Sequence, residues 1–274
     1  LVESQGRVVA ICPFQRWQFD PRTLHSSIMG PGGPAFVPDL DPDERSVVEH
    51  TIHQALQEML ASGAIDRVEI SLPPLADSSR AAWRRKSNPL LFWGFADKST
   101  ETSVIDLSPS EDELFAALCP DYRNRIRKAK KDSIEVFEAT HAGAVDDYYA
   151  LHVETYTRTG EKPHPRAYLE TIWRRVVTRG QALWLMARQG DRILGAVNMA
   201  HAKRGSLYWT GAYSRDGLKL GAGKLLQWEA IRRSKAMGNL FHEVGEVFPE
   251  AQGTKSAGLT EYKRRFGGAL VPFF

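Results

Sequence analysis

One segment, 181–245, constrains the fold of this chain more than any other. It holds three runs of apolar, β-branched and aromatic residues, separated by short turns that contain glycine, and such runs predict antiparallel strands. A glycine-rich stretch and an amphipathic run ending at Gly238 follow, and they predict a loop and a helix before a last short strand. The three strands, the loop, the helix and the last strand are expected at 182–188, 192–202, 206–213, 217–223, 224–237 and 240–244.

The N-terminal third of the chain shows a similar order of expected elements. A strand, a glycine loop, a helix and a short strand are predicted at 7–14, 30–34, 43–61 and 67–71. This repetition predicts an internal duplication, with an N-terminal domain at 1–105 and a C-terminal domain at 106–274. The expected fold class is α/β (α+β), in which each domain has a mixed central sheet flanked by helices. Because the chain starts at Leu1, close to the first strand, the N-terminal domain is expected to lack its first element.

Four helices are expected between the two repeats. Ser108, Pro109 and Glu111 form a helix start, with a hydroxyl cap, proline at the first helical position and glutamate three residues after the cap. Pro120 should end that helix, because proline cannot continue a hydrogen-bonded helix interior. The three later helices, one strongly basic and two amphipathic, are expected at 122–131, 146–159 and 165–179.

Composition excludes several classes of protein. The chain has 36 Lys and Arg against 33 Asp and Glu, and a net charge of +3 is too small for a general nucleic-acid binder, so DNA is not expected as a partner. Cys12 and Cys119 lie in unrelated contexts, which argues against a disulfide framework or a zinc scaffold. His50 and His53 are three residues apart but have no evident third ligand, so no metal site is expected. No apolar run reaches the roughly 18 residues that span a bilayer, and a cytoplasmic protein without a transmembrane segment is predicted.

The order of strand, glycine loop, helix and strand resembles the acetyltransferase superfamily called GNAT. Four local patterns narrow the resemblance to its FemABX-like branch, and they lie at 123–131, 155–158, 225–231 and 261–268. The resemblance extends over nearly the whole chain. It implies two paired GNAT-like domains and the transfer of amino acids from aminoacyl-tRNA to peptidoglycan precursors.

Acyl transfer to an amine requires a neutral nucleophile, a polarised carbonyl and a site that aligns the two. The resemblance implies that the strand containing Gly211 offers a backbone N–H to the carbonyl oxygen. It also implies that Lys263, in a Tyr-Lys-x-x-Phe pattern, lies by the donor and stabilises the oxyanion. His242, Glu243 and Glu246 are candidate general bases for the amine. An ordinary bulge at Gly211 and a half-buried structural role for His242 are the alternatives.

The donor is expected to bind where the second glycine loop opens its helix. Free N–H groups and the helix dipole favour phosphate there, although a plain loop-to-helix turn is the alternative. The segment resembles the coenzyme A loop Gln/Arg-x-x-Gly-x-Gly/Ala, but Leu218 stands where Gln or Arg is usual. Three further cations near the C-terminus, Lys255, Arg264 and Arg265, are expected either to bind a tRNA end or to be exposed. The predicted donor-binding residues are Lys219, Gly221, Gly223, Lys224, Lys255 and Arg264.

The acceptor is expected to bind cationic side chains. Helical spacing places three cations of the basic helix on one face, with Ile126 and Ala129 turned inward, and a solvated helix is the alternative. The guanidinium of Arg158 suits an acceptor phosphate or carboxylate, whereas ion pairing with Glu154 or Glu161 is its competing role. The predicted acceptor-binding residues are Arg123, Arg127, Lys131, Arg158 and Tyr213.

The leading hypothesis is an aminoacyltransferase that uses aminoacyl-tRNA and a phosphorylated or peptide-like amine acceptor. The alternatives are an N-acyltransferase that uses acyl-coenzyme A and a catalytically silent protein that binds an anionic glycan precursor. No tightly bound cofactor is expected. The expected partners are the small-molecule or peptide acceptor and a tRNA acceptor end, with peripheral attachment at the inner membrane as a further expectation.

Overall fold

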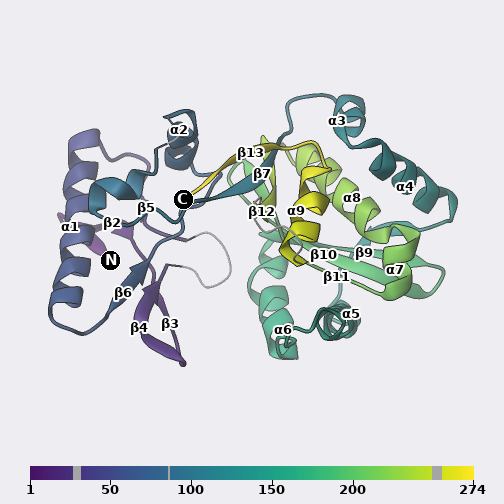
Figure 1. Ribbon diagram of the computed structural model, residues 1–274, viewed down its shortest axis with the longest axis horizontal. Coiled ribbons are helices and arrows are strands. Elements are labelled where there is room, and N and C mark those ends of the chain that lie inside the picture. Colours follow the sequence, from purple (N-terminus) through teal and green to yellow (C-terminus); the bar gives the residue numbers. More distant parts are fainter. Residues whose placement is uncertain (27–31, 86, 249–254) are drawn as a thin grey trace. The chain divides into compact units, whose positions relative to one another are not determined.

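The computed structural model describes residues 1–26, 32–85, 87–248 and 255–274, and these divide into two compact units (Figure 1). One unit comprises Leu1–Glu101 and Val271–Phe274, and the other comprises Thr102–Leu270. The chain enters the second unit within strand β7, Thr100–Asp106, and leaves it within strand β13, Ala269–Phe273. Each unit has its own hydrophobic core. Both ends of the chain belong to the first unit.

The second unit is built on a seven-stranded mixed sheet in the order β13-β7-β12-β11-β10-β9-β8. Strands β8 to β11 form antiparallel neighbours, whereas β11 and β12 are parallel. The predicted hairpins and the predicted α/β class are confirmed. The remaining strands are β8 Glu135–Glu138, β9 Ala182–Gln189, β10 Arg192–Ala202, β11 Gly205–Tyr213 and β12 Phe241–Val247.

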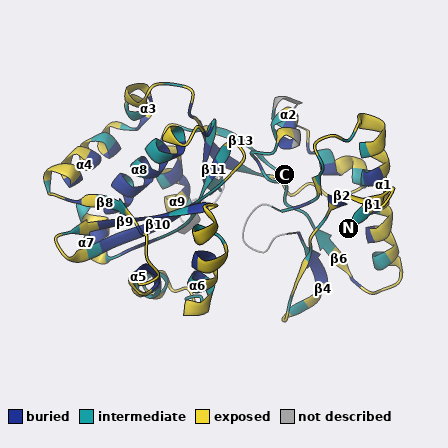
Figure 2. Cartoon of the chain, turned by 180° about the vertical axis from the view of Figure 1, so that it is seen from behind, coloured by how far each residue is buried: buried dark blue, intermediate teal, exposed yellow. Residues whose placement is uncertain are grey.

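Helices cover both faces of this sheet (Figure 1). On one face, Ile126 of α4 and Leu225 of α8 belong to a single apolar core with strand residues such as Val197. On the other face, Tyr148 of α5 and Trp173 of α6 pack with a second set of strand residues. Figure 2 shows the buried residues in dark blue along the strands and on the inward sides of these helices. The helices are α3 Glu111–Ala117, α4 Pro120–Lys131, α5 Ala144–Thr159, α6 Arg166–Arg175, η2 Val177–Arg179, α7 Arg215–Leu220, α8 Ala222–Ala236 and α9 Lys255–Arg264.

The first unit has two three-stranded sheets, β1-β2-β5 and β3-β4-β6. Val48, Ile52 and Leu56 are spaced along one face of α1 and bury that face in the core of the unit. Within the described ranges, neither α1 nor any other helix has the length and apolar character that a bilayer crossing requires. The elements are β1 Val2–Ser4, β2 Arg7–Ile11, β3 Gln15–Trp17, β4 Asp20–His25, β5 Ala35–Phe36, α1 Pro42–Ala61, β6 Arg67–Glu69, α2 Asp77–Arg85 and η1 Pro89–Trp93. Part of the predicted glycine loop at 30–34 lies outside the described residues.

Two local predictions were wrong. The helix after β7 is capped by Ser110 rather than Ser108: the Ser110 hydroxyl accepts from the backbone N–H of Glu113, whose carboxylate accepts in return from Ser110. This reciprocal capping box outcompetes the pattern two residues earlier. The predicted glycine loop at 217–223 is mostly helix α7, which ends where Gly221 adopts a left-handed conformation.

Gly217 illustrates why the loop prediction failed. A Cβ on Gly217 would overlap the backbone carbonyl oxygen of Leu194, so this glycine permits close approach of a helix to a strand rather than a flexible loop. Gly217→Ala is expected to lower the free energy of unfolding by about 1–3 kcal/mol, because backbone atoms cannot move away cheaply. Chemical denaturation of the wild type and the variant measures this difference in the free energy of unfolding.

Gly258→Ala is the matched control for that substitution. Gly258 lies within α9, and a Cβ there has nothing within 4 Å. Alanine should leave stability unchanged or raise it by up to about 1 kcal/mol. Equal effects at the two glycines would contradict the close approach at Gly217.

Candidate active site

Strands β11 and β12 part from each other within the sheet. Their parallel pairing extends only from Gly205 opposite Phe241 to Leu207 opposite Glu243. Strand β11 then continues to Tyr213 and β12 to Val247. Backbone groups beyond the last pair are not used in the ladder between these two strands, so they are open to other partners.

A bulge lies on β11 just beyond that point. Asn198 of β10 pairs with Thr210 while Met199 pairs with Tyr208, which leaves Trp209 as the additional residue. The bulge is therefore at Trp209. The alternative prediction of a bulge at Gly211 was wrong. Gly211 has a different local role, because a Cβ there would overlap the Tyr208 hydroxyl and lie 2.8 Å from Tyr213 Oη.

Glu243 is the last β12 residue paired with β11, and it is almost fully buried, at 4% exposure. The hydroxyl of Thr102 on β7 donates to Glu243 Oε1 at 2.7 Å. Burial raises the pKa of Glu243 to about 7, because desolvation outweighs the opposing effects of the Thr102 hydrogen bond and the Lys263 charge. A carboxyl group with this pKa gains and loses a proton readily at neutral pH, which a general base requires.

Lys263 reaches the same strand from α9. Its Nζ donates to the backbone carbonyl of Glu246 at 2.6 Å, and a Cβ on Gly245 would lie 3.1 Å from that Nζ. Burial lowers the pKa of Lys263 to about 8. The carboxylates of Glu246 and Glu243 raise this pKa, but their effect is smaller than that of burial. The structure thus brings together two of the predicted catalytic residues, Glu243 and Lys263, with Glu246 beside them.

Tyrosine side chains lie next to the parting strands. The hydroxyls of Tyr208 and Tyr213 are 3.2 Å apart, and Tyr262 of α9 donates to the carbonyl of Gly223 at 3.2 Å. Burial raises the pKa of all three phenols, so they are neutral hydroxyls at physiological pH. Tyr213, predicted to bind the acceptor, therefore belongs to a buried cluster that can donate hydrogen bonds without carrying charge.

The start of α8 gathers three of the predicted donor-binding residues. Gly221 and Gly223 are both buried, and a Cβ on Gly223 would lie 3.1 Å from the Tyr213 ring. Lys224 Nζ lies 4.9 Å from the centroid of the Tyr122 ring, and burial lowers the pKa of Lys224. Lys219 and Arg264 are exposed and are not brought into this group, and the side chain of Lys255 lies outside the described residues.

Arg158 lies at the C-terminal end of β11. Its Nη1 donates to the Tyr213 carbonyl at 3.1 Å, whereas its distance to the Glu154 carboxylate is 3.7 Å. The Thr155 hydroxyl accepts from the Tyr213 backbone N–H at 2.9 Å. The segment 155–158 therefore fixes the strand end beside the tyrosine cluster, and Arg158 is a cation there that also forms the alternative ion pair with Glu154.

The cations of α4 are not brought to the parting strands. Arg123 donates to the carbonyls of Ala116 and Leu118, at 2.9 Å for the latter, and the guanidinium of Arg127 lies over the Phe115 ring at 5.2 Å. Lys131 is exposed. These contacts hold α3 against α4, and the predicted inward position of Ile126 and Ala129 is confirmed by their burial.

His242 faces away from Glu243 into the core between sheet and α8. It is fully buried, with Nδ1 at 2.7 Å from the Ser206 hydroxyl and Nε2 at 2.8 Å from Gln227 Nε2. Both ring nitrogens are occupied, and burial lowers the pKa of His242 to about 3. The structure does not bring this candidate base to the site.

His242 should make stability depend on pH. Its folded-state pKa lies below the ordinary value of 6.5, so the unfolded chain binds the additional proton between those values, and stability must fall as pH drops from about 6.5 toward 3. His242→Gln should lose less stability over this pH range than wild type, by a few kcal/mol in the free energy of unfolding. Denaturant titrations at successive pH values measure the difference. Identical slopes in the two proteins would contradict a buried neutral imidazole.

The comparisons with known proteins fit this architecture. The family described as acetyltransferase (GNAT) domain matches residues 120–264. Among curated proteins none matches. Solved structures similar to the chain include FemX, at 14% identity and a TM-score of 0.71, with 99% of this chain and 86% of FemX covered.

Two further solved structures are similar over nearly the whole chain. L-PGS from Bacillus licheniformis has 13% identity and a TM-score of 0.60, with 97% of this chain and 79% of that one covered. The C-terminal domain of a putative lysylphosphatidylglycerol synthetase from Agrobacterium fabrum has 10% identity and a TM-score of 0.59, with the same coverage of 97% and 79%. At these identities the likenesses establish the fold, and the predicted FemABX-like architecture is confirmed.

Proposed function

Because the chain belongs to the GNAT acetyltransferase family and is an acyltransferase, we propose that it transfers an aminoacyl group from aminoacyl-tRNA to an amine. The proposed acceptor is a phosphorylated or peptide-like molecule. The names of the similar structures, FemX and lysylphosphatidylglycerol synthetase, support the aminoacyl group as cargo. The proposal includes a cytoplasmic location, where charged tRNA is found, and peripheral attachment to the inner membrane for a lipid-linked acceptor.

The observation that carries the proposal is that Glu243 and Lys263 are both buried at β12, where β11 and β12 part, and that the charge of each shifts the pKa of the other. A buried carboxyl group with a pKa of about 7 can take a proton from an amine. A buried ammonium group with a pKa of about 8 keeps its charge at neutral pH and can stabilise an oxyanion. The two groups supply complementary steps of one reaction.

The proposed reaction uses each group once. Glu243 removes a proton from the acceptor ammonium, and the neutral amine attacks the ester carbonyl of the donor, which forms the C–N bond. Lys263 stabilises the negative oxygen of the tetrahedral intermediate. The C–O ester bond then breaks, a second amine proton passes to the departing ribose oxygen, and the products are an amide and uncharged tRNA. Glu243 releases its proton to solvent.

Arg158 and Tyr213 are proposed to hold the acceptor near the end of β11. The side chain of Arg158 is 22% exposed, and its guanidinium group suits a phosphate or carboxylate. The buried tyrosine hydroxyl can donate to an uncharged oxygen.

An acyl-coenzyme A donor is the second candidate, and the start of α8 favours it. Gly221, Gly223 and Lys224 lie together at the N-terminus of a 15-residue helix, where a pyrophosphate would be stabilised. The Tyr213 ring lies close to Gly223, where a Cβ would be 3.1 Å from it.

A comparison of the two donors in separate reactions tests the proposal. The purified chain is incubated with labelled aminoacyl-tRNA or labelled acetyl-coenzyme A, together with a peptidoglycan-precursor peptide that carries a free lysine amine. Transfer from aminoacyl-tRNA that is lost in Glu243→Gln supports the proposal. Transfer from acetyl-coenzyme A alone, lost in Gly223→Asp, assigns the second candidate instead. Transfer from neither donor contradicts both.

A further inference from the structure

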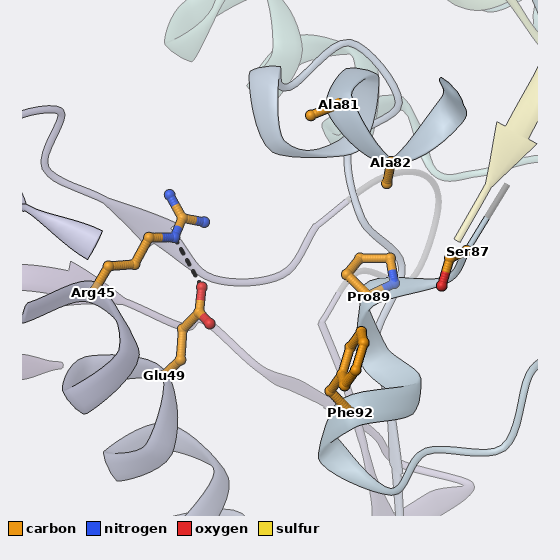
Figure 3. Close-up of a pocket in the computed structure, with 7 residues that line it drawn as sticks. All are labelled: Arg45, Glu49, Ala81, Ala82, Ser87, Pro89 and Phe92. Atoms are coloured by element: carbon orange, nitrogen blue, oxygen red, sulfur yellow. Dashed lines mark hydrogen bonds and ion pairs between the residues drawn. The ribbon is translucent and has the colours of Figure 1, made fainter. Parts of the chain in front are cut away.

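A cavity of about 440 Å³ lies within the first unit (Figure 3). This volume falls in the range of small-molecule sites, roughly 300–1,000 Å³. Helix α1 contributes two charged residues, α2 contributes two alanines, and the segment around η1 contributes the rest. The lining residues are Arg45, Glu49, Ala81, Ala82, Ser87, Pro89 and Phe92.

One wall of the cavity is an ion pair. Arg45 Nε donates to Glu49 Oε1 at 2.8 Å, and the guanidinium carbon lies 4.2 Å from the centroid of the Phe36 ring. The two contacts hold the guanidinium in place. In the hydrogen bonds and ion pairs found for the described residues, this pair uses only Nε and Oε1. Both side chains are partly exposed, Arg45 at 40% and Glu49 at 32%.

The facing wall is apolar. Figure 3 shows Pro89 and Phe92 opposite the Arg45–Glu49 pair. Phe92 is 88% exposed, which places a whole aromatic ring in water. Burial of this exposed ring by an apolar group of a ligand would release free energy.

From this arrangement we propose that the cavity binds a zwitterionic α-amino acid with a large apolar side chain. The carboxylate is held by Arg45 Nη1 and Nη2, the ammonium group by Glu49 Oε2, and the side chain lies against Phe92 and Pro89. A zwitterion satisfies both charges without separating the existing pair. A ligand carrying only a negative charge would be attracted by Arg45 but repelled by the adjacent carboxylate.

The binding site is independent of the proposed transfer reaction. It uses residues of the first unit only, and none of them is in the candidate active site. The ligand is recognised as a free amino acid by its two charges, so a blocked amino or carboxyl group must weaken binding. This requirement makes the proposal testable without any activity assay.

Calorimetric titration of the full chain with L-phenylalanine is the test. Saturable binding at millimolar concentration or tighter is expected. N-acetyl-L-phenylalanine, which lacks the cation, and L-phenylalaninamide, which lacks the carboxylate, should each bind about tenfold more weakly or worse, because each loses a hydrogen bond between charged groups. Arg45→Gln and Phe92→Ala should weaken binding of L-phenylalanine by a similar factor.

The matched controls come from the same unit. Phe19 is 80% exposed and Arg7 is ion-paired with Asp39, and neither lines the cavity. Phe19→Ala and Arg7→Gln should leave the affinity unchanged, and circular dichroism checks that all four variants are folded. Absence of saturable binding, equal binding of N-acetyl-L-phenylalanine, or equal loss in the control variants would each overturn the proposal.

Discussion

Lys263→Met is expected to lower kcat by about 10²–10³-fold, which is the usual cost of removing one donor to a developing oxyanion. The ammonium group is the cation that contacts the strand beside Glu243, through the Glu246 carbonyl. Methionine preserves much of the buried volume but carries no charge. The negative charge on the carbonyl oxygen of the donor develops only in the transition state, so KM for the donor should change little. Steady-state kinetics with saturating acceptor measures both parameters.

Arginine should not restore the activity at this position. Gly245 leaves Lys263 Nζ little space, since even a Cβ on that glycine would lie 3.1 Å from it, and the planar guanidinium group is larger than an ammonium group. Lys263→Arg is therefore expected to be nearly as slow as Lys263→Met. Lys203→Met, at an exposed lysine in the turn between β10 and β11, is the control and should keep full activity. A wild-type kcat in Lys263→Met would remove Lys263 from the mechanism.

The fold could be predicted from local signals wherever one element decides its own structure. The hairpins of β9, β10 and β11 follow from turns and alternation, and Gly238 marks the end of α8. The α7 helix could not be predicted, because Gly217 is needed for contact with the carbonyl of Leu194 on a different element. A glycine that serves tertiary packing has the same sequence signal as one that serves a loop.

The candidate site was also predictable only in part, because local patterns identify single residues but not their partners from distant segments. Lys263 belongs to a recognisable pattern, and Glu243 was one of three acidic or imidazole side chains near a strand end. Alternation along the strand could separate Glu243 from His242 but could not tell which faced the site. Thr102 lies 141 residues from its partner Glu243, so only the adjacency of their strands in the folded sheet reveals it.

Tyr208 and Tyr262 were also missed as site residues. Both lie within segments that the sequence marked as a strand and a motif, and their hydroxyls are the signal that could have identified them. Their importance depends on the parting of β11 and β12, which no local pattern encodes. The cations of α4 are a strong sequence signal, and the described contacts of Arg123 and Arg127 hold two helices together.

Transfer activity is expected to follow a bell-shaped pH profile. Glu243 acts only when ionised, so kcat should rise with pH through about 7. Lys263 acts only when protonated, so kcat should fall as pH rises through about 8. The two groups influence each other, and the limbs therefore report apparent pKa values of the pair. Initial rates at saturating substrates across this range measure the profile.

Glu243→Gln separates the two limbs. Glutamine can still accept from the Thr102 hydroxyl but cannot take a proton, so kcat should fall by about 10²–10⁴-fold and the acidic limb should disappear. The basic limb, which belongs to Lys263, should remain and shift to lower pH, because loss of the neighbouring carboxylate makes the ammonium easier to deprotonate. Thr102→Val adds a second check: without its hydrogen bond, which lowers the pKa of Glu243, the acidic limb should move to higher pH. An acidic limb that persists unchanged in Glu243→Gln would assign the general base to another group.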